Sequence, residues 1–131
     1  MKRSAVALAA VIALGRASAA LAASSLSGKY QTKVTGNHLF GGALNGTWTI
    51  KFAPGAYHVS ENGRAVVHGK DTITGNVITL KDVPGPASCP TKGKYRFSLH
   101  GKPLTFKRIS DSTSGNCLGR VIVLKHRCTK A

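Results

Sequence analysis

Apolar and polar residues alternate with a period of two along most of the chain after Ala23. In the clearest segment, 46–52, Trp48, Ile50 and Phe52 would share one face, and threonine and lysine side chains the other. Such alternation is typical of half-buried strands, and no helical periodicity of useful length accompanies it. The pattern predicts eight strands, at about 28–35, 46–53, 56–60, 65–73, 76–82, 93–100, 103–109 and 119–127.

Turn-forming residues separate these strands. Pro54-Gly55 suits a type II turn, Asn62-Gly63 is a strong hairpin signal, and Thr74-Gly75-Asn76 and His100-Gly101-Lys102 indicate two more tight reversals. If the strands run up and down, the long connections fall at one end, at about 36–45, 83–92 and 110–118. We therefore expect an all-β fold, an eight-stranded up-and-down antiparallel barrel with a cup under long loops; an avidin-like barrel is the alternative.

The hairpin at Asn62-Gly63 leaves two registers open. A two-residue turn would place Val66, His68 and Lys70 on the face of Val59, because a slip of one residue exchanges the faces of a strand. A three-residue turn with Gly63 in the left-handed region would instead place Ala65, Val67, Gly69 and Ile73 there. The second register buries more apolar surface and is favoured, and it turns Asp71 inward unless Gly69 marks a bulge.

The first 22 residues have the pattern of a secretory signal peptide. Lys2 and Arg3 precede an apolar, alanine-rich core, and small residues allow cleavage after either Ala19 or Ala22. Residues 23–131 would then form one domain of a secreted or periplasmic protein. A disulfide would help its modest hydrophobic core to stabilise the fold. No apolar run is long enough to span a membrane.

The three cysteines are expected to form one disulfide. Cys117 and Cys128 flank the predicted last strand, which would separate them by roughly 30 Å. Cys89 and Cys117 lie in two long loops at the same end, so the topology predicts a Cys89–Cys117 bridge. Cys128 is then left as a reduced, partly buried thiol, or as a thiol that is modified or bridged to another molecule. No Cys-x-x-Cys motif or close histidine pair is present, and no metal or other cofactor is expected.

The charge balance is strongly basic, with 19 Lys and Arg against 4 Asp and Glu and a net charge of +15. A basic outer face would attract anionic polymers or membrane and envelope surfaces. Specific nucleic-acid binding is not expected, because alternation places most strand aromatics inside rather than on stacking platforms. Outward positions of the last three predicted strands give this face Lys94, Arg96, Lys107, Lys125 and Arg127.

Three sequence features together resemble the lipocalin/calycin superfamily, and more closely its small secreted bacterial members. They are Leu44-Asn45-Gly46-Thr47-Trp48, Gly93-Lys94-Tyr95 before an alternating strand, and Cys117-Leu118-Gly119-Arg120. The resemblance implies a ligand carrier or binding module. It also implies a basic partner for an aromatic residue of the early strands, either Lys125 or Arg127 for Tyr30, or Arg120 for Trp48.

The function expected from the sequence is binding without catalysis, by a monomer. The four acids are isolated along the chain, and turn capping accounts for Asp82 and Asp111, so no enzyme is expected. A small apolar or amphipathic ligand would lie in the cup; attachment to an anionic surface, or a protease-inhibitor-like module made from the bridged loops, is the alternative. The cup and lid candidates are Trp48, Tyr57, Tyr95, Phe97, Phe106, His38 and Phe40.

Overall fold

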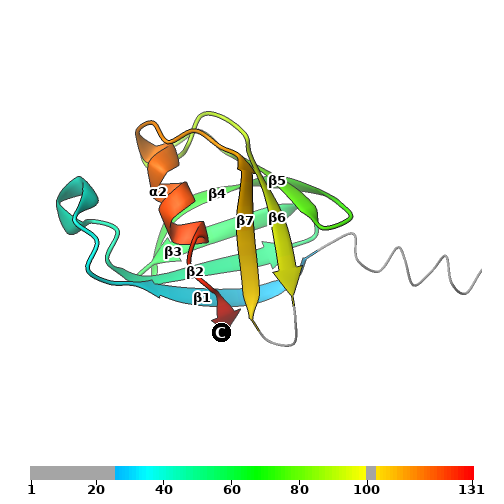
Figure 1. Ribbon diagram of the computed structural model, residues 1–131, viewed down its shortest axis with the longest axis horizontal. Coiled ribbons are helices and arrows are strands. Elements are labelled where there is room, and N and C mark those ends of the chain that lie inside the picture. Colours follow the sequence, from blue (N-terminus) through cyan, green and yellow to red (C-terminus); the bar gives the residue numbers. More distant parts are fainter. Residues whose placement is uncertain (1–25, 100–102) are drawn as a thin grey trace, which may run out of the picture.

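The computed structural model describes residues 26–99 and 103–131. The predicted signal peptide and the predicted reversal at 100–102 lie outside these residues. The described chain is mostly β, with eight antiparallel strands and one short α-helix (Figure 1). The elements are β1 (Gly28–Val34), η1 (Leu39–Gly42), β2 (Gly46–Ala53), β3 (Ala56–Glu61), β4 (Arg64–Thr74), β5 (Val77–Asp82), β6 (Gly93–Leu99), β7 (Leu104–Ser110), α2 (Asn116–Leu124) and β8 (Thr129–Lys130).

The strands form one strongly curled sheet in the order β7-β6-β5-β4-β3-β2-β1-β8, as expected for an up-and-down barrel. Each of the first seven strands pairs with its neighbour in the chain, so the predicted meander is confirmed. The C-terminal segment links the two sides of the curl. Cys128 exchanges backbone hydrogen bonds with Leu104 at the start of β7, and β8 pairs with β1.

The predicted eighth strand at 119–127 is wrong, because this segment is helical. Cys117, Val121 and Leu124 are buried at helical spacing, so one face of α2 packs toward the sheet (Figure 1). The β-branched residues 121–123 favour a strand by propensity alone, but tertiary packing decides the outcome. The eighth strand is instead the two-residue β8.

The β3–β4 hairpin combines features of both registers that the sequence allowed. Its turn has two residues, since Asn62 and Gly63 both have positive φ values, 51° and 82°. The register then shifts between Val59 and Ser60, which places Val67 opposite Val59. The predicted burial of Gly69 and Asp71 is confirmed, but a β-bulge produces it and not a three-residue turn.

The buried side chains form two clusters. The larger fills the curled sheet, and the smaller surrounds Trp48, whose indole nitrogen donates to the Leu44 carbonyl at 2.8 Å. The basic partner of Tyr30 is Lys130, whose Nζ lies 5.0 Å from the ring centroid, and neither Lys125 nor Arg127 takes that place. Members of the larger cluster include Tyr30, Ile50, Phe52, Tyr57, Ile78, Leu80, Tyr95, Leu104, Leu124 and Cys128, and of the smaller Val34, Leu44, Trp48 and Val123.

The predicted Cys89–Cys117 disulfide is confirmed, and Cys128 is a free, fully buried thiol. Its geometry differs from the one expected, because Cys117 lies in the first turn of a helix and does not precede a strand. The bridge joins the β5–β6 loop to the first turn of α2. Within the described ranges, no helix has the length and hydropathy to cross a membrane.

We expect the Cys128 thiol to react very slowly with a thiol reagent in the native protein. Burial raises the pKa of this thiol to about 11, so at pH 8 the thiolate fraction is about two orders of magnitude below that of an ordinary cysteine. Kinetics of modification by an aromatic disulfide reagent at pH 8 would measure this. The same protein unfolded in guanidinium is the control, and its single free thiol should rapidly release one equivalent of the reagent's aromatic thiolate. Fast modification of the native protein would contradict the burial of Cys128.

Candidate functional site

A mostly apolar cavity of about 70 Å³ lies between the inner face of the curled sheet and α2. It occupies the boundary between the two buried clusters, because Trp48 and Val123 of the smaller one and Phe52 and Leu80 of the larger one all contribute to its wall. Its lining residues are Trp48, Ile50, Phe52, Tyr57, Val59, Val67, Leu80, Asp82, Ala87, Phe106, Asn116, Gly119, Arg120, Val123 and Leu124.

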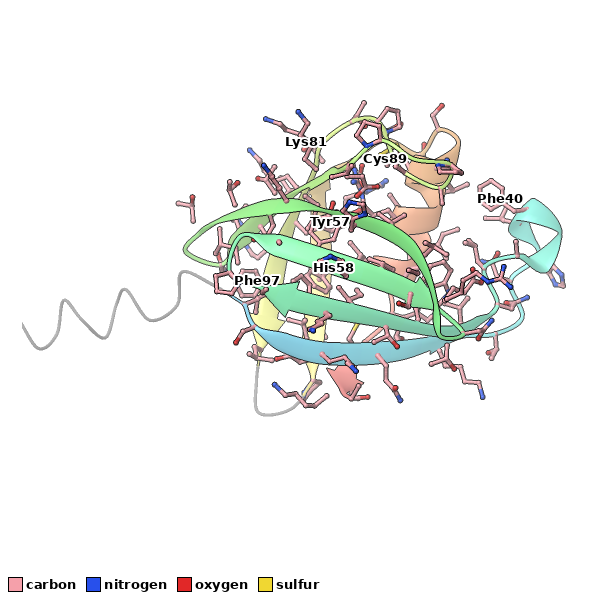
Figure 2. The ribbon with its side chains drawn as sticks, turned by 180° about the vertical axis from the view of Figure 1, so that it is seen from behind. Phe40, Tyr57, His58, Lys81, Cys89 and Phe97 are labelled. Atoms are coloured by element: carbon pink, nitrogen blue, oxygen red, sulfur yellow. A yellow bond between two sulfur atoms is a disulfide. The ribbon has the colours of Figure 1, made fainter. Side chains whose placement is uncertain are left out.

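One edge of this cavity is polar. Asp82 ends β5 and Arg120 projects from α2, and the Arg120 Nη1 atom lies 3.5 Å from Asp82 Oδ1. Tyr57 of β3 donates its hydroxyl hydrogen to the same Asp82 oxygen at 2.5 Å. The backbone N–H of Cys89 donates to the other oxygen at 2.7 Å, so the disulfide-linked loop is tied to this edge. Both Tyr57 and Cys89 are labelled in Figure 2.

Asp111 holds the opposite side of the Arg120 guanidinium. Arg120 Nε and Nη2 donate to the two Asp111 oxygens at 2.8 and 2.7 Å, and Nη2 also donates to the Thr91 carbonyl at 2.8 Å. The Tyr95 hydroxyl donates to Asp111 at 2.5 Å. Asp111 and Tyr95 therefore mirror Asp82 and Tyr57, with the single guanidinium between the two pairs. We call Tyr57, Asp82, Tyr95, Asp111 and Arg120 the arginine cluster.

Burial governs the protonation of the arginine cluster. Burial, followed by the hydrogen bond to Asp82, raises the pKa of Tyr57 far above its ordinary value, and burial with Asp111 does the same for Tyr95. Burial opposes the charge on Arg120, but the hydrogen bonds and charge of Asp111 outweigh it and raise the pKa of the guanidinium. Both hydroxyls thus remain donors, and the guanidinium remains a cation, at neutral pH.

Two strand glycines make room for the arginine cluster. A Cβ at Gly69 would overlap the Tyr57 hydroxyl and the Lys81 carbonyl, because the Tyr57 ring crosses β4 at Gly69 on its way to Asp82. A Cβ at Gly93 would lie 2.6 Å from Asp111 Oδ2 and 2.7 Å from Arg120 Nη2. Neither glycine needs its conformational freedom, so both serve close approach.

The structure brings only part of the predicted cup together. Trp48, Tyr57 and Phe106 line the cavity. Tyr95 is buried and Phe97 is half-buried, and neither belongs to the lining. His38 and Phe40 are exposed, and Phe40 lies on the η1 loop that projects beyond the sheet (Figure 2). Neither residue lines the cavity, which is bordered instead by α2 and the 83–92 loop, through Asn116 and Ala87.

Asp82, Asp111 and Arg120 are the site residues that sequence reasoning missed. The two acids were expected to be isolated turn caps, whereas both contact one arginine in the structure. Arg120 was expected on a strand, where it could face Trp48. A usable signal was present in the glycines at 69 and 93, since a glycine inside a strand often marks the close approach of another group.

The residues of the predicted basic face lie on β6, on β7 and in the segment after α2. Lys94, Arg96 and Lys107 are exposed on β6 and β7, as expected. Lys125 and Arg127 are also exposed, but they follow α2 and do not extend that pair of strands. Arg127 lines an open groove with Lys33 of β1 and Thr47 of β2. Arg127 also precedes Cys128, which pairs with Leu104 at the start of β7, and a single basic face formed by all five residues stays a prediction.

Comparisons of the chain with family models, with curated protein sequences and with solved structures found no match. The curled antiparallel sheet is compatible with a barrel fold, and the finer resemblance to lipocalins stays a prediction. The features of the structure that bear on function are the cavity, the arginine cluster and the surface charge.

Asp71 faces the sheet interior near Tyr57 and offers a test of its electrostatics. Burial raises the pKa of this carboxyl above its ordinary value of 3.8, so the folded state disfavours the charged form. Asp71→Asn should therefore raise the melting temperature at pH 7, where the wild-type side chain is ionised. The gain should shrink as the pH falls through the raised pKa and vanish below about 3.8, where both states of the wild type are protonated.

Thermal unfolding of wild type and Asp71→Asn at pH 7 and pH 3.5 would measure this difference. Thr72→Asn, at the neighbouring exposed position, is the matched control and should show no pH-dependent gain. A loss of stability in Asp71→Asn at pH 7 would show that the carboxylate stabilises the fold, contrary to this account.

Proposed function

We propose that the protein is an exported, non-enzymatic binding protein that holds part of a small apolar or amphipathic molecule in the cavity beneath α2. The observation that carries this proposal is the cavity itself, an apolar space with a polar edge between two well-packed clusters. Apolar pockets with a few converging polar groups are typical of small-molecule sites. Export is supported by the disulfide, which forms and persists in oxidising compartments.

The size of the cavity limits the ligand. Sites for drug-sized molecules typically enclose about 300–1,000 Å³, whereas this cavity encloses about 70 Å³. Only a short group of a few heavy atoms fits inside. The remainder of a larger ligand would lie at the rim, where Ala87 and Asn116 are exposed. The expected ligand is therefore a molecule with one narrow end and not a bulky hydrophobe enclosed by the sheet.

Native mass spectrometry of the full chain, expressed with its own leader and purified from an oxidising compartment, tests carriage. We expect the native mass to exceed the denatured mass by that of a bound small molecule. Val67→Phe, which fills the cavity wall, should remove the excess, and Arg108→Gln, at an exposed site on β7, should keep it. A native mass equal to that of the oxidised polypeptide in all three proteins would contradict carriage.

A second candidate function is attachment to an anionic polymer or surface. It is favoured by the distribution of charge, in which most acidic side chains are buried and most basic ones lie outside. Of the four acidic side chains, Asp71, Asp82 and Asp111 are buried, and Glu61 alone is partly exposed, at the β3–β4 hairpin. The described outer surface therefore carries lysines and arginines with almost no carboxylate beside them. Such a surface attracts polyanions over distances set by ionic strength.

Binding to heparin, measured across a series of salt concentrations, tests this second function. We expect log affinity to fall linearly with log salt, because bound cations are released from the polyanion. Lys94→Glu/Arg96→Glu/Lys107→Glu should weaken binding and reduce the slope. Affinity that does not change with salt, or no binding near 50 mM salt, would exclude electrostatic attachment.

A further inference from the structure

The Arg120 guanidinium has one donor group that the protein leaves unused. Its Nε and Nη2 atoms donate to Asp111 and Thr91, as described above. Its Nη1 atom is buried and has no hydrogen-bond partner within the described part of the chain. The side chain as a whole is only 9% exposed. Solvent at the surface therefore does not satisfy this donor.

Of the three guanidinium nitrogens, Nη1 is the one that is paired with a carboxylate of the cavity lining. Its nearest acidic neighbour, Asp82, lines the cavity, and so does Tyr57, which is hydrogen-bonded to Asp82. Asp111 and Thr91, which hold the other two nitrogens, are not part of the lining. The unused donor thus stands at the polar edge of an otherwise apolar cavity. The 3.5 Å distance to Asp82 gives ionic attraction without a hydrogen bond.

A buried donor without a partner is costly, and native proteins rarely keep one. Here the partner can come from a molecule in the cavity. Most of the remaining wall is apolar, with Phe52, Leu80, Phe106 and Val123 around the space, so such a molecule would combine one oxygen acceptor with a hydrocarbon part. The acceptor would bind Nη1, and the hydrocarbon would fill the space toward Trp48.

The charges of the cluster select the kind of acceptor. One guanidinium faces two buried carboxylates, whose side chains are 4% and 0% exposed. A third negative charge at Nη1 would be repelled by Asp82 in a region of low dielectric constant. An uncharged oxygen meets no such repulsion. We infer that the cavity recognises an uncharged carbonyl-type oxygen on a narrow hydrocarbon chain, with Arg120 Nη1 as the donor that fixes it; this inference rests on the proposed small-molecule function.

An isosteric ligand series tests the inference on the wild-type protein. Pentan-2-one has the carbonyl, 2-methylpent-1-ene replaces the oxygen by a methylene group, and butanoate is charged. We would titrate each into ¹⁵N-labelled protein and follow the Arg120 side-chain and Gly119 backbone signals by NMR. The ketone should bind saturably and about tenfold or more tightly than the alkene, because only the ketone satisfies the buried donor. Butanoate should bind more weakly than the ketone.

Two variants control for the location of binding. Val67→Phe should abolish the shifts by filling the wall, and Arg108→Gln, at an exposed arginine, should leave them unchanged. Equal affinity for ketone and alkene would overturn the role of Arg120 while leaving carriage of apolar groups intact. Tighter binding of butanoate would overturn the preference for an uncharged oxygen. If the ketone did not bind saturably, the inference would be overturned. The proposed function is tested separately, by native mass spectrometry.

Discussion

Arg120→Leu should lower the free energy of unfolding by about 3–5 kcal/mol, the largest effect expected of any single substitution outside the disulfide. The variant would leave the Asp82 and Asp111 carboxylates buried, at 4% and 0% exposure, without the one cation that pairs with them among the described residues. The tyrosine hydroxyls at Tyr57 and Tyr95 would still donate to them, but hydrogen bonds from neutral groups do not replace the lost charge.

Denaturant unfolding at pH 7, followed by the fluorescence of the single tryptophan, would measure the loss. Trp48 lines the cavity beside α2 and therefore reports on this part of the core. Arg108→Leu, at an exposed position on β7, is the matched control and should change stability by no more than about 0.5 kcal/mol.

A second variant separates burial of charge from loss of packing. Arg120→Leu/Asp82→Asn/Asp111→Asn removes the cation together with both anions, while the carboxamides can still accept from the two tyrosines. It should be more stable than Arg120→Leu alone, because no unpaired charge remains buried. If the triple variant were less stable than Arg120→Leu, the carboxylates would be stabilising the fold in some way other than pairing with Arg120.

The strands were predictable because their signal is local. Alternation such as that of Trp48, Ile50 and Phe52 needs no knowledge of the partner strand, and Pro54-Gly55 fixes where the hairpin reverses. The register of β4 was less predictable. Its turn is the two-residue type that Asn62-Gly63 indicates. A bulge then exchanges the inward and outward faces of β4, and the residues of the turn do not predict that bulge.

The helix and the arginine cluster were missed for different reasons. In α2 the β-branched run 121–123 favours a strand, and the stripe formed by Cys117, Arg120, Val121 and Leu124 at spacings of three and four residues was too short to outweigh it. The cluster joins residues 82, 111 and 120 through the fold, and no sequence spacing connects them. The arginine cluster could therefore be recognised only once the position of α2 was known.

The Cys89→Ala/Cys117→Ala variant should be less stable than the wild type by about 3–4 kcal/mol. The bridge closes a sequence separation of 28 residues, and its loss restores the entropy of that loop to the unfolded chain. The two segments are also linked by the Asn116 amide bonds to the Pro86 and Ser88 carbonyls, at 3.0 and 3.2 Å, and by the bond from Arg120 Nη2 to the Thr91 carbonyl, at 2.8 Å. Asn116 is exposed, so its bonds compete with water and replace little of the loss.

Denaturant unfolding with and without reductant measures this contribution within one experiment. Reductant should lower the stability of the wild type to that of the double variant and leave the variant unchanged, since Cys128 has no disulfide to lose. An equal response of both proteins would mean that the reductant acts elsewhere. Because Ala87 and Asn116 belong to the two segments that the bridge joins, the same reduction should also weaken pentan-2-one binding. Loss of stability without loss of binding would show that the cavity rim is held by the Cys89–Asp82 and Asn116 contacts and not by the disulfide.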